Sequence, residues 1–503
     1  MRLRSSDRNA GVILHPTSLP GPYGIGDLGQ AAHAWVDLLA NSSTGLWQVL
    51  PLGPTGYADS PYQCFSSFAG NTNLISPEGL VDDELVDESD LVGEQWPPHT
   101  VAYGRLIPWK RKLLEVAFER QRAGGGGPNL AADLEAFRRA QAWWLDEFAL
   151  FMALKERHGG GPWIDWPREL RVREPAALSA ARGAERDTIE RHVFSQFLFF
   201  RQWTTLKQHA ASRNVRLIGD IPMFVAADSA DVWSRLDLFR LDEEGRPTVV
   251  AGVPPDYFSP TGQLWGNPLY DWDRHAAEDY DWWARRLGAT LDLVDIVRID
   301  HFRAFADYWE IPADAETAIT GRWVDGPGMA FFEALNRRLG DVPVIAEDLG
   351  DLSPAVPALL EDVGYPGMRI LQFAFDSDES NEFLPDHYPV RCVAYTGTHD
   401  NDTTLGWWNN APRAEAAFAK RYLGLDGTDP VEAFLETLWA SKAMFALAPL
   451  QDLLRLDSTA RMNVPGTTDG NWKWRASADG LSEALAEQLR DLNRRHHRLA
   501  PAR

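Results

Sequence analysis

The stretch Asp295-Ile-Val-Arg-Ile-Asp-His-Phe302 has the pattern of a short buried β-strand whose last residues are charged or polar. Side chains of a strand alternate between its two faces, so Arg298 and Asp300 share one face. An arginine beside a carboxylate lowers the pKa of that carboxylate and keeps it ionised, as a nucleophile must be. The same pair could instead fill a polar layer inside a barrel, and this stretch by itself leaves both interpretations open.

Two further apolar runs end in acids. Val344-Ile-Ala-Glu-Asp-Leu-Gly350 places Glu347 directly after a strand, where barrel enzymes carry catalytic groups. Desolvation there would raise the pKa of Glu347 and suit it to be a general acid, although either Glu347 or Asp348 could cap the next helix. The stretch Tyr395-Thr-Gly-Thr-His-Asp-Asn-Asp-Thr-Thr404 fits an active-site rim better than a calcium loop, because it lacks the Gly-x₅-Glu ending of an EF-hand. Its His399 could also be a helix-cap or core histidine.

Short strand-like runs recur along the chain, with plausible amphipathic helices over residues 28–40, 329–339 and 354–363. This alternation favours an α/β fold of the (β/α)₈ TIM barrel type over an open doubly wound sheet. Acids ending the fourth, fifth and seventh runs would meet at one rim, where two carboxylates about 5–5.5 Å apart permit retaining glycosyl transfer. The predicted strands are residues 11–15, 46–51, 215–221, 295–301, 342–348, 368–373, 392–396 and 446–450.

Two segments exceed ordinary loop length. One contains an acidic patch, a Gly124–Gly127 run and a long helical pattern over residues 130–158, which predicts an inserted helical subdomain. The glycine run lacks the Gly-Lys-Ser/Thr ending of a phosphate-binding loop and indicates a flexible connector. In the other, residues 252–267 are rich in Gly, Pro and aromatics and are expected to form a functional loop. The predicted division is 1–79 for the first two strands, 80–205 for the helical insertion and 206–503 for the remaining barrel, including a second insertion at 226–294 that carries a covering loop.

The composition limits the possible partners. The formal net charge is −23, from 49 Lys and Arg against 72 Asp and Glu, which argues against nucleic acid or an anionic membrane surface. With Cys64 and Cys392 as the two cysteines, a disulfide framework or a cysteine zinc site is not expected. No apolar run approaches the roughly 18 residues of a membrane helix, so a cytoplasmic location is expected. Some of the 21 Trp lie in Gly/Pro-rich loops, where they could stack on a neutral sugar.

Ten short stretches match one known family in order and nearly end to end. The chain resembles the amylomaltases, 4-α-glucanotransferases (disproportionating enzymes) related to the α-amylase superfamily. One departure is Ala304, where that pattern has Gly; it affects the shape of the groove rather than the chemistry. The stretches include Leu14-His-Pro-Thr-Ser-Leu-Pro-Gly-Pro-Tyr-Gly-Ile-Gly-Asp-Leu-Gly29, Gly262-Gln-Leu-Trp-Gly-Asn-Pro268, Arg298-Ile-Asp-His-Phe-Arg303, Ala346-Glu-Asp-Leu-Gly350, Thr398-His-Asp-Asn-Asp402 and Asn463-Val-Pro-Gly-Thr467.

By this resemblance, Asp300 is the nucleophile, Glu347 the acid/base and Asp400 the transition-state stabiliser of a retaining double displacement. Arg298 would keep Asp300 ionised, and His399 would hydrogen-bond the sugar at the cleavage subsite. Residues 257–265 and 463–470 would form loops over the cleft. The further residues that the resemblance places against the glucan are Ser60, Tyr62, Asp220, Gln263 and Trp265.

The resemblance also implies the substrates: maltooligosaccharides and α-1,4-glucans such as amylose, starch or glycogen fragments. It implies no cofactor and no metal, and a monomer or weak homodimer is expected. Aromatic side chains on the covering loops, Tyr257, Phe258 and Trp265, could exclude water, so that an acceptor 4-hydroxyl competes successfully for the glycosyl-enzyme.

Three alternatives remain open at this point. A glucan hydrolase of the same clan would share the three carboxylates, and only the covering loops argue against it. A non-catalytic glucan-binding protein on a decayed barrel is disfavoured because all three acids are retained. A dehydrogenase is poorly supported: Gly24-Ile-Gly-Asp-Leu-Gly29 fits Gly-x-Gly-x-x-Gly as a bare pattern but lacks the strand–turn–helix context.

Overall fold

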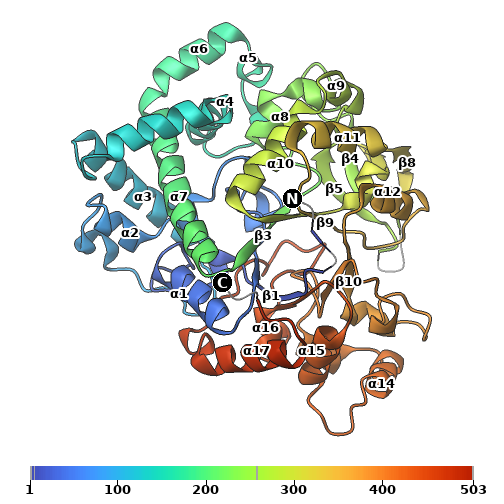
Figure 1. Ribbon diagram of the computed structural model, residues 1–503. Helices are drawn as coiled ribbons and strands as arrows, with labels where there is room; N and C mark the ends of the chain where they lie inside the picture. Colours follow the sequence, from blue (N-terminus) through green and yellow to red (C-terminus); the bar gives the residue numbers. More distant parts are fainter. Residues whose placement is uncertain (1–2, 5, 256–258, 501–503) are drawn as a thin grey trace.

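The computed structural model describes residues 3–4, 6–255 and 259–500, and its centre is an eight-stranded parallel sheet (Figure 1). The spatial order is β10-β11-β12-β1-β2-β3-β6-β9. Between β9 and β10 the Ala346 N–H donates to the Pro366 carbonyl at 2.9 Å, so the sheet is nearly closed. The strands are Asn9–Ile13 (β1), Leu46–Gln48 (β2), Arg216–Ile221 (β3), Ile296–Ile299 (β6), Val344–Ala346 (β9), Gly367–Ile370 (β10), Cys392–Tyr395 (β11) and Phe445–Pro449 (β12).

Side chains from all eight strands meet in one interior cluster, which is how a filled barrel differs from an open sheet. The predicted barrel class is therefore confirmed, and each predicted run contains or overlaps a barrel strand. The errors are at strand ends: the run predicted at 368–373 leaves the sheet after Ile370, and Leu371–Phe375 is a 3₁₀ helix. An apolar pattern shows burial, whereas the end of a strand is set by where its hydrogen-bonded neighbour stops. The cluster comprises Ile13, Leu46, Ile218, Ile296, Ile345, Met368, Ile370, Val393, Tyr395, Met444, Phe445 and Leu447.

The segment between β2 and β3 is helical and lies on one side of the barrel, coloured blue through cyan to green in Figure 1. Helix α4 packs against α7, which runs almost directly into β3. The domain boundary predicted at residue 205 falls inside α7, and the division into subdomains stays a prediction. The helices are Pro77–Asp82 (α2), Tyr103–Arg122 (α3), Leu130–Arg157 (α4), Arg168–Arg171 (α5), Pro175–Ala184 (α6) and Arg186–Ser212 (α7).

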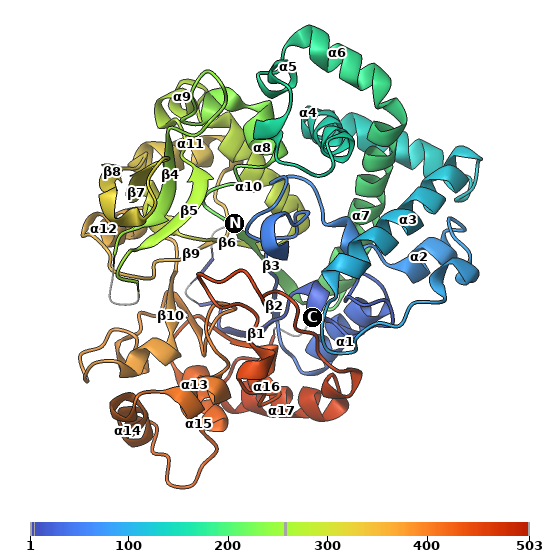
Figure 2. The ribbon, with the colours of Figure 1, turned by 180° about the vertical axis from the view of Figure 1, so that it is seen from behind.

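A four-stranded antiparallel sheet lies on the other side of the barrel, opposite α3–α7 in both views (Figures 1 and 2). The prediction of a loop over residues 252–267 is wrong in part, because strands β4 and β5 reach into it. Strand β4 also pairs with β7, which comes from beyond β6 in the sequence, and such a distant pairing leaves no local signal. Tyr257 and Phe258 of the predicted covering loop lie outside the described residues. The order is β5-β4-β7-β8, formed by Val249–Val253 (β4), Gln263–Pro268 (β5), Asp307–Pro312 (β7) and Arg322–Asp325 (β8).

The remaining helices surround the barrel (Figure 2). The helices predicted at 28–40, 329–339 and 354–363 are found as α1, α11 and α12. Among the described residues, no helix combines the length and apolar character needed to cross a membrane. The helices are Gln30–Asn41 (α1), Ala230–Ser234 (α8), Trp272–Ala277 (α9), Asp281–Leu293 (α10), Gly328–Leu339 (α11), Ala355–Val363 (α12), Thr404–Asn410 (α13), Arg413–Tyr422 (α14), Pro430–Ala440 (α15), Leu450–Leu453 (α16) and Glu483–Arg495 (α17).

Candidate active site

Asp300 and Glu347 follow the carboxyl ends of neighbouring parallel strands, β6 and β9. Ile296 and Ile345 point into the barrel, so alternation along each strand continues the inward-facing row to Asp300 and Glu347 at the rim. The backbone holds both: the Asp300 N–H donates to the Ile221 carbonyl at 2.9 Å, and the Glu347 N–H donates to the Ile299 carbonyl at 3.0 Å. The fold therefore brings these two acids together, as the sequence predicts.

Arg298 lies on the same inward row and connects two acids. Its Nη2 is 2.9 Å from Asp300 Oδ1, which confirms the predicted contact, and its Nη1 donates to Asp220 Oδ2 at 2.6 Å. The Arg298 side chain is 4% exposed and that of Asp220 is 0% exposed, whereas 29% of the Asp300 side chain faces solvent. The guanidinium therefore lies beneath the cleft, with Asp300 between it and solvent.

Glu347 has a different partner. Its Oε2 accepts the backbone N–H of His301 at 2.6 Å, and His301 adopts a left-handed conformation with φ 52°. Burial raises the pKa of Glu347, while the charge of Arg298 and this N–H act in the opposite direction. Burial also raises the pKa of Asp300 well above its usual range, with the Arg298 guanidinium opposing the rise and the Glu347 charge adding to it. The two carboxyl groups thus share a desolvated site in which double ionisation is disfavoured.

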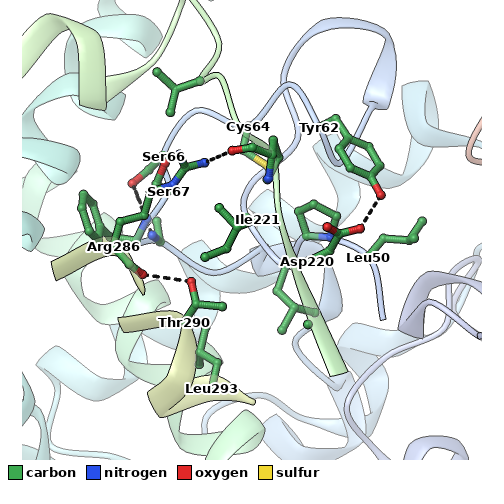
Figure 3. A pocket seen from close by; sticks show the side chains of 18 of the residues that line it. Leu50, Tyr62, Cys64, Ser66, Ser67, Asp220, Ile221, Arg286, Thr290 and Leu293 are labelled. Atoms are coloured by element: carbon green, nitrogen blue, oxygen red, sulfur yellow. Dashed lines mark hydrogen bonds between the residues drawn. The ribbon is translucent and has the colours of Figure 1, made fainter. Parts of the chain in front are cut away.

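Asp220 is the most deeply buried of these charged groups. The Tyr62 hydroxyl donates to its Oδ2 at 2.7 Å (Figure 3), and its Oδ1 is buried without a hydrogen-bond partner among the described residues. A cavity of about 60 Å³ lies behind it and is lined in part by Cys64 and Arg286 (Figure 3). Burial raises the pKa of the Cys64 thiol to about 12, so this cysteine is not a nucleophile at neutral pH.

Asp400 lies on the loop after β11, and its side chain is 45% exposed. Its Oδ1 accepts a hydrogen bond from the Asn463 amide at 2.6 Å, and its Oδ2 is 3.4 Å from His399 Nε2. Its backbone carbonyl accepts a bond from Arg461 Nη2 at 2.6 Å, and Arg461 Nε donates to the Asn463 carbonyl at 2.7 Å. Asp400 is therefore held by the segment that follows η11 (Ser458–Ala460).

His399 is buried against two aromatic rings, which also contact each other. Its ring stacks on Tyr62, with centroids 5.0 Å apart and planes 16° apart, and lies 5.9 Å from the Trp472 ring. Burial lowers the pKa of His399, and the Asp400 charge opposes this shift. A neutral imidazole is thus presented beside Asp400.

A cleft of about 290 Å³ opens above these groups. Ser60, Tyr62 and Trp265 line it together with Asp300, His399 and Asp400. Gln263 is not part of the lining, but its Oε1 accepts the Trp265 indole N–H at 3.0 Å. Asp220 and Arg298 are buried behind the lining residues, whereas Glu347 is half-buried and bonded to His301, which lines the cleft. The structure thus brings all ten predicted residues to one site: six line the cleft, Glu347 lies beside them, and Asp220, Gln263 and Arg298 support the lining.

Several residues at the site were not singled out from the sequence, among them His301, Arg461, Asn463 and Trp472. The Trp265 ring meets the His301 ring edge to face at 4.9 Å, so His301 contacts both the acid Glu347 and the second sheet. Asn463 lies within the predicted covering segment 463–470, and Trp472 lies just after it. That predicted segment was the sequence feature that could have pointed to both residues. Within the described residues, no group of three or more His, Cys, Asp or Glu side chains is arranged to hold a metal ion.

Comparisons with known proteins agree on one family. A family model described as 4-alpha-glucanotransferase matches residues 14–481. The 4-alpha-glucanotransferase of Thermus thermophilus is 50% identical, over 98% of this chain and 99% of that protein, and the one of Synechocystis sp. is 46% identical, over 96% of each. The solved amylomaltase from Streptococcus agalactiae, in complex with acarbose, aligns with a TM-score of 0.95 and 38% identity over 98% of this chain and 99% of that one. The chain therefore belongs to the 4-alpha-glucanotransferase family and is an enzyme of this type.

Proposed function

We propose that this enzyme transfers α-1,4-glucan segments by a retaining double displacement, with Asp300 as nucleophile and Glu347 as acid/base. The observation that carries the assignment is the unequal environment of the two carboxyl groups. Asp300 contacts the Arg298 guanidinium at 2.9 Å, whereas the Glu347 carboxylate accepts the backbone N–H of His301 at 2.6 Å. When the pair holds one proton, the full positive charge favours ionised Asp300 and leaves the proton on Glu347.

In the first step, an Asp300 carboxylate oxygen attacks the anomeric carbon while Glu347 gives its proton to the glycosidic oxygen. The bond between that oxygen and the anomeric carbon breaks, and the shortened glucan leaves with a free 4-hydroxyl. In the second step, the Glu347 carboxylate takes the proton from the 4-hydroxyl of an acceptor glucan. The acceptor oxygen attacks the anomeric carbon, and Asp300 is released as a carboxylate.

Asp400 is proposed to stabilise the oxocarbenium-like transition state from the cleft side. Its exposed carboxylate can accept hydroxyl hydrogen bonds from a sugar, with Asn463 and His399 fixing its two oxygens at 2.6 and 3.4 Å. Hydrogen bonds that strengthen as the ring distorts favour the transition state over the bound substrate.

The other site residues are proposed to position the glucan. Tyr62 and Trp265 offer aromatic surfaces, and Ser60 and His399 offer polar groups to the cleft. The fully buried side chain of Asp220 acts through its bonds to Arg298 and Tyr62, and its predicted contact with sugar hydroxyls stays a prediction. Gln263 holds the Trp265 indole.

The proposed substrates are maltooligosaccharides and longer α-1,4-glucans such as amylose, starch or glycogen fragments. The family name and the acarbose bound to the Streptococcus agalactiae relative support this choice. A cytoplasmic location and a monomer or weak homodimer remain predictions from the sequence. Gel filtration with light scattering tests the assembly state.

Transfer in preference to hydrolysis is proposed to depend on what covers the cleft. Trp265 from β5 and residues 463 and 465–468 line the opening. An acceptor stacked there is held close to the glycosyl-enzyme, while bulk water is displaced.

The deciding experiment is incubation of the enzyme with maltotriose, without added metal or nucleotide, beside Glu347→Gln. Glucose together with maltopentaose and longer products, all absent from the variant, is expected. Glucose and maltose alone would make the enzyme a hydrolase and overturn the covering argument. The absence of products from both proteins would overturn the substrate assignment.

A further inference from the structure

The proposed mechanism leaves one conspicuous residue unused: His15, in the stretch Leu14-His-Pro-Thr-Ser-Leu-Pro20. His15 follows strand β1 at the rim and is 5% exposed. Its Nδ1 accepts the backbone N–H of Leu50 at 3.2 Å. Burial, and secondarily the nearby His399, lower the pKa of His15 to about 3. The imidazole is therefore neutral, and because Nδ1 is an acceptor, Nε2 carries the hydrogen.

For His399, the hydrogen bonds do not show which ring nitrogen carries the hydrogen. Its Nδ1 is buried with no hydrogen-bond partner among the described residues, while its Nε2 lies 3.4 Å from Asp400 Oδ2. A neutral imidazole carries one hydrogen, so His399 can be protonated at Nε2 or at Nδ1. Only the Nε2–H form can donate toward Asp400 or a sugar hydroxyl. In the other form, a nitrogen lone pair would face the carboxylate.

Both rings line one small cavity. It has a volume of about 20 Å³ and is lined by His15, His399 and Gln451, among others. One water molecule needs roughly 10–15 Å³ measured in this way, and two to four polar partners. The Gln451 amide N–H donates to the Ala460 carbonyl at 3.2 Å, so the side-chain oxygen of Gln451 remains available as an acceptor.

We infer that one water in this cavity accepts the Nε2–H of His15 and donates to Nδ1 of His399, which fixes His399 as the Nε2–H tautomer. The second hydrogen of the water is directed to the Gln451 oxygen. His15 is then a positioning residue that acts through His399. The tautomer itself is independent of the proposed function, whereas its effect on sugar binding rests on that function.

Two substitutions distinguish the role of Nδ1 of His15 from the role of its Nε2. In His15→Asn, the side-chain oxygen takes the place of Nδ1 and keeps the bond from Leu50 N–H, but the Nε2–H is lost. In His15→Gln, the amide N–H reaches the place of Nε2, while the acceptor for Leu50 is lost. A packing role predicts that both variants behave alike, whereas the inference predicts that they differ.

The test is ¹⁵N NMR of histidine side chains in the substrate-free enzyme, with the His399 signals assigned by their loss in His399→Gln. Wild type and His15→Gln are expected to show His399 protonated at Nε2 alone, and His15→Asn to show a mixture of tautomers. Loss of the donated bond is also expected to raise KM for maltotriose about tenfold in His15→Asn and less in His15→Gln.

Protonation of His399 at Nδ1 in the wild type would overturn the inference even if a variant failed to fold. An unchanged tautomer in a folded His15→Asn would overturn it as well. If the tautomers change as expected but KM does not, the water link stands, and the proposed contact between His399 and the sugar is wrong.

Discussion

Asp300 and Glu347 are held by the barrel backbone and by a buried arginine, whereas Asp400 is held by side chains of the segment after η11. The first pair lies on adjacent strand ends, and its partners, Arg298 and the His301 N–H, belong to the same barrel strand or the residues directly after it. Asp400 is 45% exposed, and besides its neighbour His399 it is held by Arg461 and Asn463, which lie more than sixty residues further along the chain.

We expect this difference to matter for the proposed roles of the three acids. The proposed nucleophile and acid lie on neighbouring strands and keep their spacing, because the sheet would have to break to change it. The proposed stabiliser, Asp400, is bonded to a loop segment, which we expect to adjust more readily when a glucan binds. Substitutions of Asp300, Glu347 or Arg298, on the barrel strands (the barrel side), should therefore impair the chemical step. Substitutions in the segment that holds Asp400 (the segment side) should change how the enzyme responds to its substrate.

The largest effect is expected for Asp300→Ala. Loss of the nucleophile should lower kcat by about 10⁴-fold or more, because no glycosyl-enzyme can form. With α-maltosyl fluoride and azide, the vacated space should allow azide to attack directly and give the β-glycosyl azide, which chromatography and NMR identify. Glu347→Ala is the matched control: its Asp300 still forms the intermediate, so azide should give the α-product. If Asp300→Ala gave the α-azide and Glu347→Ala the β-azide, Glu347 would be the nucleophile and Asp300 the acid/base.

Arg298→Met should show how much the barrel side depends on one cation. Removing a partner from a buried ion pair leaves Asp220 uncompensated and should lower the free energy of unfolding by about 3–5 kcal/mol. Without the guanidinium, the pKa of Asp300 rises further. Asp300 must be ionised, so activity is lost as the pH falls through its pKa, and the acidic limb of kcat/KM should move to higher pH.

The control for this change is Arg303→Met, which breaks the buried pair of Arg303 with Asp307 outside the cleft. Denaturant titration should show destabilisation in both variants, while pH–rate profiles should show a displaced acidic limb in Arg298→Met alone. An acidic limb that stayed in place in Arg298→Met would remove Arg298 from the ionisation of Asp300.

The barrel was predictable because its parallel strands are buried on both faces and leave continuous apolar runs. The acids Asp300 and Glu347 were predictable for the same reason, since each interrupts such a run at its end. The four-stranded sheet was not, because β8 is exposed at three of its four residues and β4 pairs with β7 across an intervening barrel strand. Pairing of that kind depends on tertiary structure.

The missed site residues have equally specific causes. His301 binds Glu347 through its backbone N–H, which a positive φ exposes, and no residue type in the sequence encodes that bond. Asn463 and Arg461 reach Asp400 across 63 and 61 positions of the chain. Their contacts become visible only when the loops after β11 and η11 are placed together.

A smaller effect is expected for Asn463→Ala, on the segment side of the comparison. A hydrogen bond to a charged group contributes about 1.5–3 kcal/mol, which corresponds to a ten- to hundredfold loss of kcat/KM for maltotriose. In the background of Asp400→Asn the same substitution should cost much less, since its charged partner is gone. Arg455→Met, which breaks exposed ion pairs with Asp429 and Glu432, is the neutral control. Equal losses in both backgrounds would show that Asn463 does not act through Asp400.

The smallest effect is expected at Trp265, where the second sheet meets the cleft. Trp265→Phe keeps an aromatic face but loses the bond from the indole N–H to Gln263, so KM should rise only a few-fold, as for a neutral hydrogen bond. Trp265→Ala also removes the covering surface and should lower the ratio of transfer to hydrolysis, measured as maltopentaose against reducing ends formed from maltotriose. If Trp265→Ala changes KM and leaves this ratio as in the wild type, Trp265 binds glucan without excluding water. The preference for transfer would then depend on the segment that also holds Asp400, and both substrate-responsive functions would lie on one side of the cleft.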